Sequence, residues 1–185
     1  MKRHLPFALT TLRLLLGPIA LACAWTGVAR LFFVPILVCG TLSDIFDGVL
    51  ARRFGIATPG LRRYDSITDV VYYLFLLACV WQLCRPVVTE NPWAIAIILL
   101  SEAGSIAMCA LKFGKYPATH SWLAKFYGLC LLGGLIALLA FGAGRWVVVA
   151  LAAMALLTNL EIIALHLLAD TPPVDVCAIF NRRKS

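Results

Sequence analysis

Long apolar stretches alternate with short polar breaks along most of the chain. A helix needs roughly 20 apolar residues to cross the hydrocarbon core of a bilayer. Six stretches meet that length, at about residues 10–28, 31–51, 66–84, 92–111, 123–142 and 146–168. The pattern therefore predicts six transmembrane helices and an all-α integral membrane protein.

The breaks between these stretches carry residues that are typical of turns, and we predict them as connections. The longest predicted loop is Arg52–Tyr64, which holds four arginines, two glycines and a proline. Residues 170–185 contain a Pro-Pro pair and are predicted to form a short cytoplasmic tail. We expect residues 1–185 to make up a single membrane domain.

Composition agrees with a membrane location. Hydrophobic residues make up 62% of the chain, charged residues only 14%, and the mean hydropathy is +0.93. These values exclude a disordered chain, a disulfide scaffold and a secreted enzyme. The net charge of +7 would suggest nucleic acid binding in a soluble protein, but here the positions of the charges matter more, and we expect no nucleic acid partner. The seven cysteines lie mostly in apolar runs, which indicates buried thiols.

The positive charges are distributed unequally over the predicted connections. With six spans, both termini and the second and fourth connections lie on one side of the membrane. Thirteen of the sixteen Lys and Arg residues fall on that side, and the other side has Arg30, Arg85 and Arg145. Because cytoplasmic loops carry the excess of Lys and Arg, we expect both termini in the cytoplasm. The compact size favours a bacterial inner (plasma) membrane.

Acidic residues gather at the end of the second span and the start of the third. The second span ends with residues that share one narrow helix face at about 100° per residue: Asp44, Asp47, Gly48 and Ala51. Asp65 and Asp69 are four residues apart and share a face of the third span. Because the connection between the two spans is short, these faces are neighbours, and four carboxylates can converge.

Such a cluster needs a cation. Each Asp at membrane depth costs about 2.5–3.5 kcal/mol on an insertion scale, so four would cost roughly 10 kcal/mol before they repel one another. Arg52 and the loop arginines could offset part of this, but clustered hard oxygen ligands favour Mg²⁺ or Mn²⁺. The alternative is that these residues are helix caps and solvated boundary residues, a reading that fits Asp65 well. Four acids on two adjoining faces favour the metal site.

The same residues carry a family signature, D-x2-D-G-x2-A-R-x8-G-x3-D-x3-D, which extends over residues 44–69. The positions that match are Asp44, Asp47, Gly48, Ala51, Arg52, Asp65 and Asp69. The chain thereby resembles the CDP-alcohol phosphotransferases, integral membrane enzymes of phospholipid synthesis. One position departs, because Leu61 stands where the family has its second glycine, with Gly60 just before it. Upstream, Thr10, Arg13 and Pro18 resemble the family's opening segment.

The resemblance implies a transferase that uses two Mg²⁺ or Mn²⁺ ions and a CDP-linked lipid such as CDP-diacylglycerol. It implies that the metal ligands are Asp44, Asp47, Asp65 and Asp69. Asp69 is also implied as the catalytic general base for the hydroxyl of an acceptor alcohol, which displaces CMP. Gly48, Ala51 and Arg52 are implied to seat the CDP moiety.

The acceptor is the open part of this prediction. A group of basic residues forms either a pocket for a phosphorylated acceptor or a set of orientation charges: Arg62, Arg63, Lys112, Lys115 and Lys125. Lys125 lies closest to an apolar run and is the preferred acceptor-binding residue, with Arg13 as a second candidate. We expect phosphatidylglycerophosphate synthesis, with inositol phosphate, serine or another alcohol as alternative acceptors. A homodimer, a member that has lost turnover and a divalent-cation transporter stay open.

Two further acids, Glu102 and Glu161, lie inside predicted spans and outside the signature. Ionisable groups at membrane depth are functional candidates by default. Pairing with Arg13 or Lys125, or contact with a water-filled cavity, would explain them.

Overall fold

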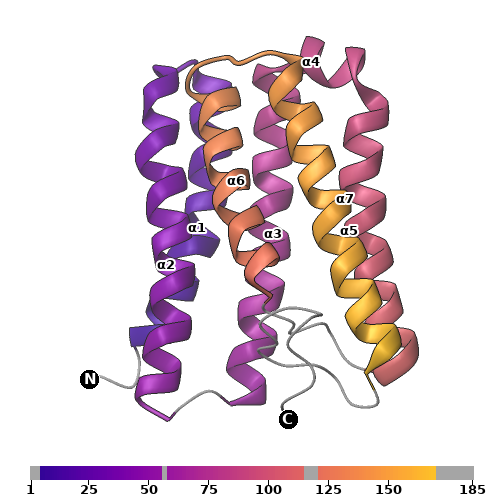
Figure 1. Cartoon of the computed structure of the whole chain (residues 1–185). Coiled ribbons are helices and arrows are strands. Elements are labelled where there is room, and N and C mark those ends of the chain that lie inside the picture. The colour runs from indigo at the N-terminus through magenta and orange to yellow at the C-terminus, as the bar shows by residue number, and fades with distance from the viewer. Residues whose placement is uncertain (1–4, 56–57, 115–120, 170–185) are drawn as a thin grey trace. The chain divides into compact units, whose positions relative to one another are not determined.

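The computed structural model describes residues 5–55, 58–114 and 121–169, except for the side chains of Pro59 and Arg62. These residues form α-helices, one short 3-10 helix and no strand, which confirms the all-α class (Figure 1). In chain order the elements are α1 (Leu5–Thr26), η2 (Arg30–Phe32), α2 (Phe33–Arg53), α3 (Pro59–Leu83), α4 (Arg85–Glu90), α5 (Pro92–Phe113), α6 (Trp122–Leu139) and α7 (Arg145–Leu168). The predicted tail, 170–185, lies outside the described residues.

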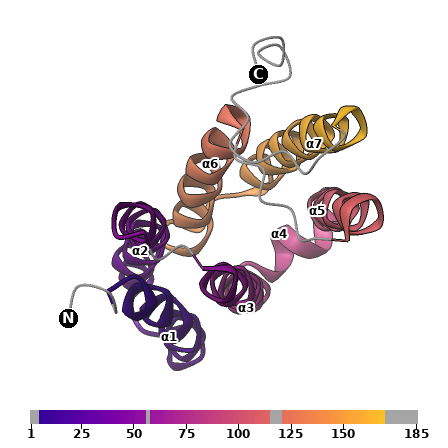
Figure 2. The ribbon, with the colours of Figure 1, turned by 90° about the horizontal axis from the view of Figure 1, so that it is seen from below.

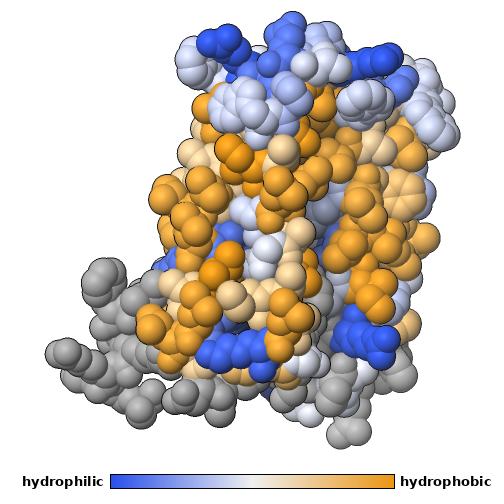
Figure 3. All heavy atoms as spheres, turned by 90° about the vertical axis from the view of Figure 1, so that its right-hand side faces the viewer, coloured by the Kyte–Doolittle hydropathy of each residue, from blue (hydrophilic) through white to orange (hydrophobic). Residues whose placement is uncertain are grey.

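Within the described residues, six segments are long and apolar enough to cross a membrane, as the hydrophobic pattern predicts. They are Leu5–Thr26, Arg30–Arg53, Arg63–Leu83, Pro92–Phe113, Trp122–Leu139 and Arg145–Leu168. At most 33% of the most apolar window of any span is buried inside the protein. Many large apolar side chains therefore point outward, and on the face in Figure 3 they form a broad band with hydrophilic side chains toward its ends. A surface of this kind suits contact with lipid.

The long loop predicted at Arg52–Tyr64 is wrong, because most of that segment is helical. Helix α2 continues through Arg53, and α3 already begins at Pro59. Thr58 caps α3: its backbone is extended, and its hydroxyl oxygen accepts a hydrogen bond of 3.2 Å from the Leu61 backbone N–H. Pro59 occupies the first turn, where its missing N–H costs no helical hydrogen bond. This capping chemistry starts the helix earlier than the charge pattern suggests.

The break predicted around residues 85–92 is also more ordered than expected. Residues Arg85–Glu90 form the short helix α4, and α5 follows with Pro92 in its first turn. Helix α5 ends at Phe113 and is followed by Gly114, whose φ of +62° is left-handed and favours glycine. At this break the predicted turn signals mark the end of α3 and the start of α5 but miss the short helix between them.

The chain divides into two compact units. The first comprises residues 1–86 with 135–143, and the second comprises 87–134 with 144–185. In the first unit α1 packs against both α2 and α3, which lie together in the view of Figure 2. In the second unit α5 packs against α7. The single domain expected for the whole chain stays a prediction.

Glycines allow close helix contacts inside each unit. A Cβ added to Gly17 of α1 would lie 2.7 Å from Cδ2 of Phe75 in α3, and one added to Gly40 of α2 would lie 2.8 Å from Cζ of Tyr72. In the second unit, a Cβ on Gly134 would lie 2.6 Å from Cδ1 of Leu151. Small residues at such positions let membrane helices approach closely. The contacts around Gly17 and Gly40 fix the helices that carry the acidic residues.

Candidate functional site

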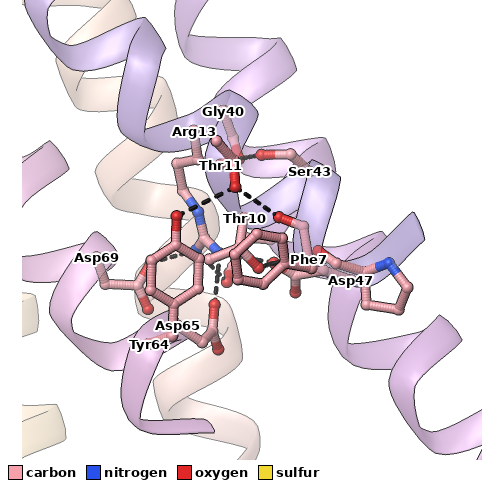
Figure 4. Close-up of polar contacts among 12 residues, drawn as sticks. Phe7, Thr10, Thr11, Arg13, Gly40, Ser43, Asp47, Tyr64, Asp65 and Asp69 are labelled. Carbon is pink, nitrogen blue, oxygen red and sulfur yellow. Dashed lines mark hydrogen bonds and ion pairs between the residues drawn. The ribbon is translucent and has the colours of Figure 1, made fainter. Parts of the chain in front are cut away.

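All four acids of the cluster lie in the first unit. Asp44 and Asp47 lie on one face of α2, near its C-terminal end, and Asp65 and Asp69 lie on one face of the N-terminal part of α3. The short connection brings these two faces together, as the spacing predicts. Helix α1 completes the arrangement by placing Arg13 among the four carboxylates. Figure 4 shows the Arg13 side chain beside Asp47, Asp65 and Asp69.

Arg13 forms an ion pair with every one of the four acids. Its Nη1 donates to Oδ1 of Asp44 at 2.5 Å and also to Oδ1 of Asp69. Its Nη2 donates to Oδ2 of Asp47 at 2.8 Å and to Oδ1 of Asp65 at 2.6 Å. The Arg13 side chain is only 2% exposed. A single planar guanidinium thus provides the positive charge in the middle of the cluster.

The cluster has a buried side and an accessible side. The side chain of Asp47 is 5% exposed, and its Oδ2 also accepts a hydrogen bond of 2.9 Å from the hydroxyl of buried Thr10. The side chains of Asp44, Asp65 and Asp69 are 50%, 35% and 36% exposed. The cluster is therefore open to its surroundings on the side of these three acids.

The donor set fits a divalent metal ion. Asp44, Asp47 and Asp65 each offer a carboxylate oxygen, and these oxygens lie within 4.8 Å of one another. Four carboxylates and one guanidinium leave a net charge of about −3 if all are ionised, which favours further cations. Carboxylate oxygens are the ligands that Mg²⁺ and Mn²⁺ prefer. Asp69 contacts the same guanidinium but stands outside the group of three.

The residues predicted to seat CDP lie along α2 beside the cluster. Ala51 is buried, and Arg52 is exposed. A Cβ added to Gly48 would meet only the guanidinium of Arg52, at 3.7 Å from Nη1 and 4.0 Å from Nη2. The helix surface at Gly48 is therefore open and is flanked by a positive charge, as a phosphate-binding surface requires.

A second layer of contacts joins α1 to α3 next to the cluster. The ring of Phe7 stacks on the ring of Tyr64 with centroids 4.8 Å apart. The hydroxyls of Thr11 and Tyr64 are within hydrogen-bond distance, at 3.1 Å (Figure 4). The sequence analysis did not identify Phe7, Thr11 or Tyr64, and it did not predict that Arg13 lies at the centre of the cluster. The sequence did hold a signal for Arg13, since Thr10 and Arg13 are three residues apart and share a face of the first span.

The departure from the signature at Leu61 falls in the first turn of α3. Leu61 is helical there, so the backbone at this position does not need the conformational freedom of glycine. The neighbouring Gly60 has open space where a side chain would stand. The glycine of the signature is therefore not required for the backbone conformation at the start of α3.

The basic residues of the proposed acceptor pocket have different surroundings. Lys112 caps the end of α7, since its Nζ donates to the carbonyl oxygens of His166 and Leu167 at 2.9 and 2.7 Å. Lys125 is exposed on α6, with its ammonium 5.4 Å from the centroid of the Trp122 ring. Arg63 is exposed on α3. Lys115 and the side chain of Arg62 lie outside the described residues.

The two remaining intramembrane acids have uncharged partners in the second unit. Glu161 accepts a hydrogen bond of 2.7 Å from the hydroxyl of Ser121. Glu102 lies close to the side chains of Tyr127 and Asn159. The amide of Asn159 also donates to the hydroxyl of Ser101 at 3.2 Å. Hydrogen bonds of this kind satisfy polar side chains inside membrane helices, and the sequence did not point to them.

Comparison with known proteins agrees with this geometry. The sequence model of a family described as CDP-alcohol phosphatidyltransferase matches residues 3–165. Two curated relatives from Mycobacterium tuberculosis, strains CDC 1551 / Oshkosh and ATCC 25618 / H37Rv, are each named probable phosphatidylglycerophosphate synthase. Each is 28% identical over 125 residues, which cover 63% of this chain and 56% of the relative. The matched part thus spans little more than half the length of these relatives. No solved structure gives a significant match.

Proposed function

The chain belongs to the CDP-alcohol phosphatidyltransferase family, a family of membrane transferases, and from this premise we propose that it synthesises phosphatidylglycerophosphate. In this reaction a phosphatidyl group moves from CDP-diacylglycerol to glycerol 3-phosphate, and CMP is released. The observation that carries the proposal is the set of three carboxylate oxygens within 4.8 Å of one another, contributed by two helices, with Asp69 beside them. The name of the two relatives supports glycerol 3-phosphate over the other acceptors.

The cluster would hold two divalent ions, Mg²⁺ or Mn²⁺, on Asp44, Asp47, Asp65 and Asp69. When bound, such ions neutralise the charge of the diphosphate and stabilise the attacking and leaving oxygens of an in-line displacement. Thr10 holds the buried carboxylate of Asp47 in place through its hydrogen bond. Gly48, Ala51 and Arg52 provide the open, positively flanked surface for CDP.

Asp69 is the proposed general base. Its side chain is partly exposed, so an acceptor hydroxyl can come within hydrogen-bond reach. A carboxylate oxygen of Asp69 takes the proton of that hydroxyl, and the acceptor oxygen forms a bond to the phosphorus on the lipid side. The bond from this phosphorus to the bridging oxygen of the diphosphate breaks, and CMP leaves with that oxygen.

Lys125 and Arg13 are the proposed contacts for the phosphate of the acceptor. A phosphorylated acceptor needs a positive partner, whereas serine or another neutral alcohol does not. We place the site at the cytoplasmic face of a bacterial inner membrane, supported by the thirteen positive charges on the side that carries the acidic cluster.

The test is CMP release by the purified full chain in detergent, with CDP-diacylglycerol, Mg²⁺ or Mn²⁺, and separately glycerol 3-phosphate, inositol phosphate or serine. We expect release with glycerol 3-phosphate. Release only with another acceptor would refute the acceptor and leave the transferase chemistry standing. No release with any alcohol would refute the proposal, and Mn²⁺ uptake into vesicles without CDP-lipid would favour a transporter instead.

Matched variants connect the activity to the cluster. Asp44→Asn with Asp47→Asn removes two proposed ligands and is expected to abolish CMP release. Glu90→Gln removes one carboxylate from the exposed end of α4 and is expected to leave CMP release unchanged. Equal activity in both variants would show that the acidic cluster is not the site of the reaction.

A further inference from the structure

Arg13 uses all of its terminal N–H groups on the carboxylates proposed to hold metal. Nη1 and Nη2 each donate to two different aspartates, so the four terminal N–H groups have four partners. The remaining donor, Nε, is buried without a hydrogen-bond partner among the described residues. The guanidinium thus provides one hydrogen bond to each aspartate, while its own Nε–H has no hydrogen-bond acceptor among the described residues.

The guanidinium and divalent ions compete for the same groups. The bonded oxygens include Oδ1 of Asp44, Oδ2 of Asp47 and Oδ1 of Asp65, from the three acids that come close enough to share an ion. A guanidinium that stayed 2.5–2.8 Å from these oxygens would also stand within a few ångströms of any ion bound to them. Like charges at that separation repel strongly away from bulk water.

We propose that Arg13 is the resident counter-cation of the aspartate cluster, and that divalent metal ions bind by displacing its guanidinium. The inference rests on the metal site of the proposed function. Arg13 lets four carboxylates fold side by side in a membrane before metal arrives, and it weakens metal binding because it must first be released. The released guanidinium then becomes available to an acceptor phosphate, which is the role predicted for it from the sequence.

The direct test measures Mn²⁺ binding to the full chain in detergent without CDP-lipid, from the electron paramagnetic resonance signal of free Mn²⁺. Arg13→Gln removes the competitor and is expected to lower the Kd for Mn²⁺ by at least about tenfold, since the ion no longer has to displace a guanidinium from the four carboxylates. Arg53→Gln is the matched control, because it removes one exposed positive charge from the end of α2, and it is expected to leave the Kd within about twofold.

Each outcome of this test is decisive. An unchanged or higher Kd in Arg13→Gln would overturn the displacement, while the metal site of the proposed function would stand. The absence of Mn²⁺ binding in both the wild-type chain and Arg13→Gln would overturn the metal site itself, and the inference with it.

A second measurement covers the case in which Arg13→Gln fails to fold. Guanidinium nitrogen resonances of the wild-type chain labelled at arginine are followed by NMR during a Mg²⁺ titration, with Arg13 assigned by comparison with Arg13→Lys. Displacement predicts that the Nη signals of Arg13 shift in parallel with Mg²⁺ occupancy. Signals that stay unchanged at saturating Mg²⁺ would overturn the proposal.

Discussion

Substituting Gly40 by alanine tests whether close packing of α2 against α3 sets the geometry of the acidic cluster. The added Cβ would lie 2.8 Å from Cζ of Tyr72 and 3.2 Å from its Cε1, and it would also meet the hydroxyl oxygen. Tyr72 is buried at 3% exposure, and its rigid ring cannot turn aside in the way that a flexible side chain can. The two helices must therefore move apart.

The expected magnitude follows from two opposing effects. Overpacking of a buried contact costs about 1–3 kcal/mol. Alanine in place of glycine in a helix gains about 1 kcal/mol. Gly128→Ala in α6 provides the matched control, because it makes the same helical gain where a Cβ meets nothing within 4 Å. The difference between the two variants isolates the packing cost, and we expect Gly40→Ala to be less stable than Gly128→Ala by about 1–3 kcal/mol.

Moving α2 away from α3 should also change the geometry of the acidic cluster, because α2 carries Asp44 and Asp47 while α3 carries Asp65 and Asp69. A misplacement of about 1 Å can reduce a rate by roughly 100-fold. The assay combines denaturant unfolding in detergent with CMP release and the Kd for Mn²⁺. The double variant Gly40→Ala/Tyr72→Phe lacks the tyrosine hydroxyl that the added Cβ would meet. It should recover part of the lost stability and part of the lost activity. A Gly40→Ala variant with wild-type stability and activity would refute the claim that this contact holds the cluster in register.

Three other predictions concern the chemistry. Asp69→Asn keeps the size of the side chain and is expected to lower kcat by about 10²–10⁴ while CDP-lipid binding stays measurable; full turnover would remove the proposed base. Lys125→Glu is expected to raise the KM for glycerol 3-phosphate and leave the KM for CDP-diacylglycerol unchanged, whereas an unchanged acceptor KM would count against its role. Chelation of divalent ions with EDTA is expected to abolish CMP release, and added Mg²⁺ or Mn²⁺ to restore it; activity that persists in EDTA would contradict the metal assignment.

Periodicity was sufficient to predict the six spans and the two acidic faces, because both depend on local sequence. The spacing of Asp44 and Asp47, and of Asp65 and Asp69, determines which residues share a face once the helices form. The boundary at Thr58 was missed because it depends on a side-chain cap, while the neighbouring arginines suggested a solvated loop. Capping signals of a single residue are easily outweighed by charge in a pattern analysis.

The contact between Arg13 and the four acids was harder to predict than the spans or the acidic faces, because Arg13 comes from a different helix. Arg13 is 31 residues before Asp44 and 56 before Asp69, so only tertiary packing brings the groups together. The side chains next to Glu102 and Glu161 are uncharged and also distant in sequence, and residue type alone gave no reason to select them. The sequence indicated that the acids need a cation and that Arg13 is a candidate site residue, but it did not show that Arg13 contacts the four acids.

The position of Arg13 in α1 has a consequence for how the protein is made. Synthesis runs from the N-terminus, so α1 leaves the ribosome before α2 and α3. The guanidinium of Arg13 is therefore already in the bilayer when the acid-bearing helices follow, and each newly inserted aspartate can form an ion pair with it. If the order of the helices were permuted so that α1 came last, the nascent chain would hold four carboxylates in the membrane with no arginine to receive them.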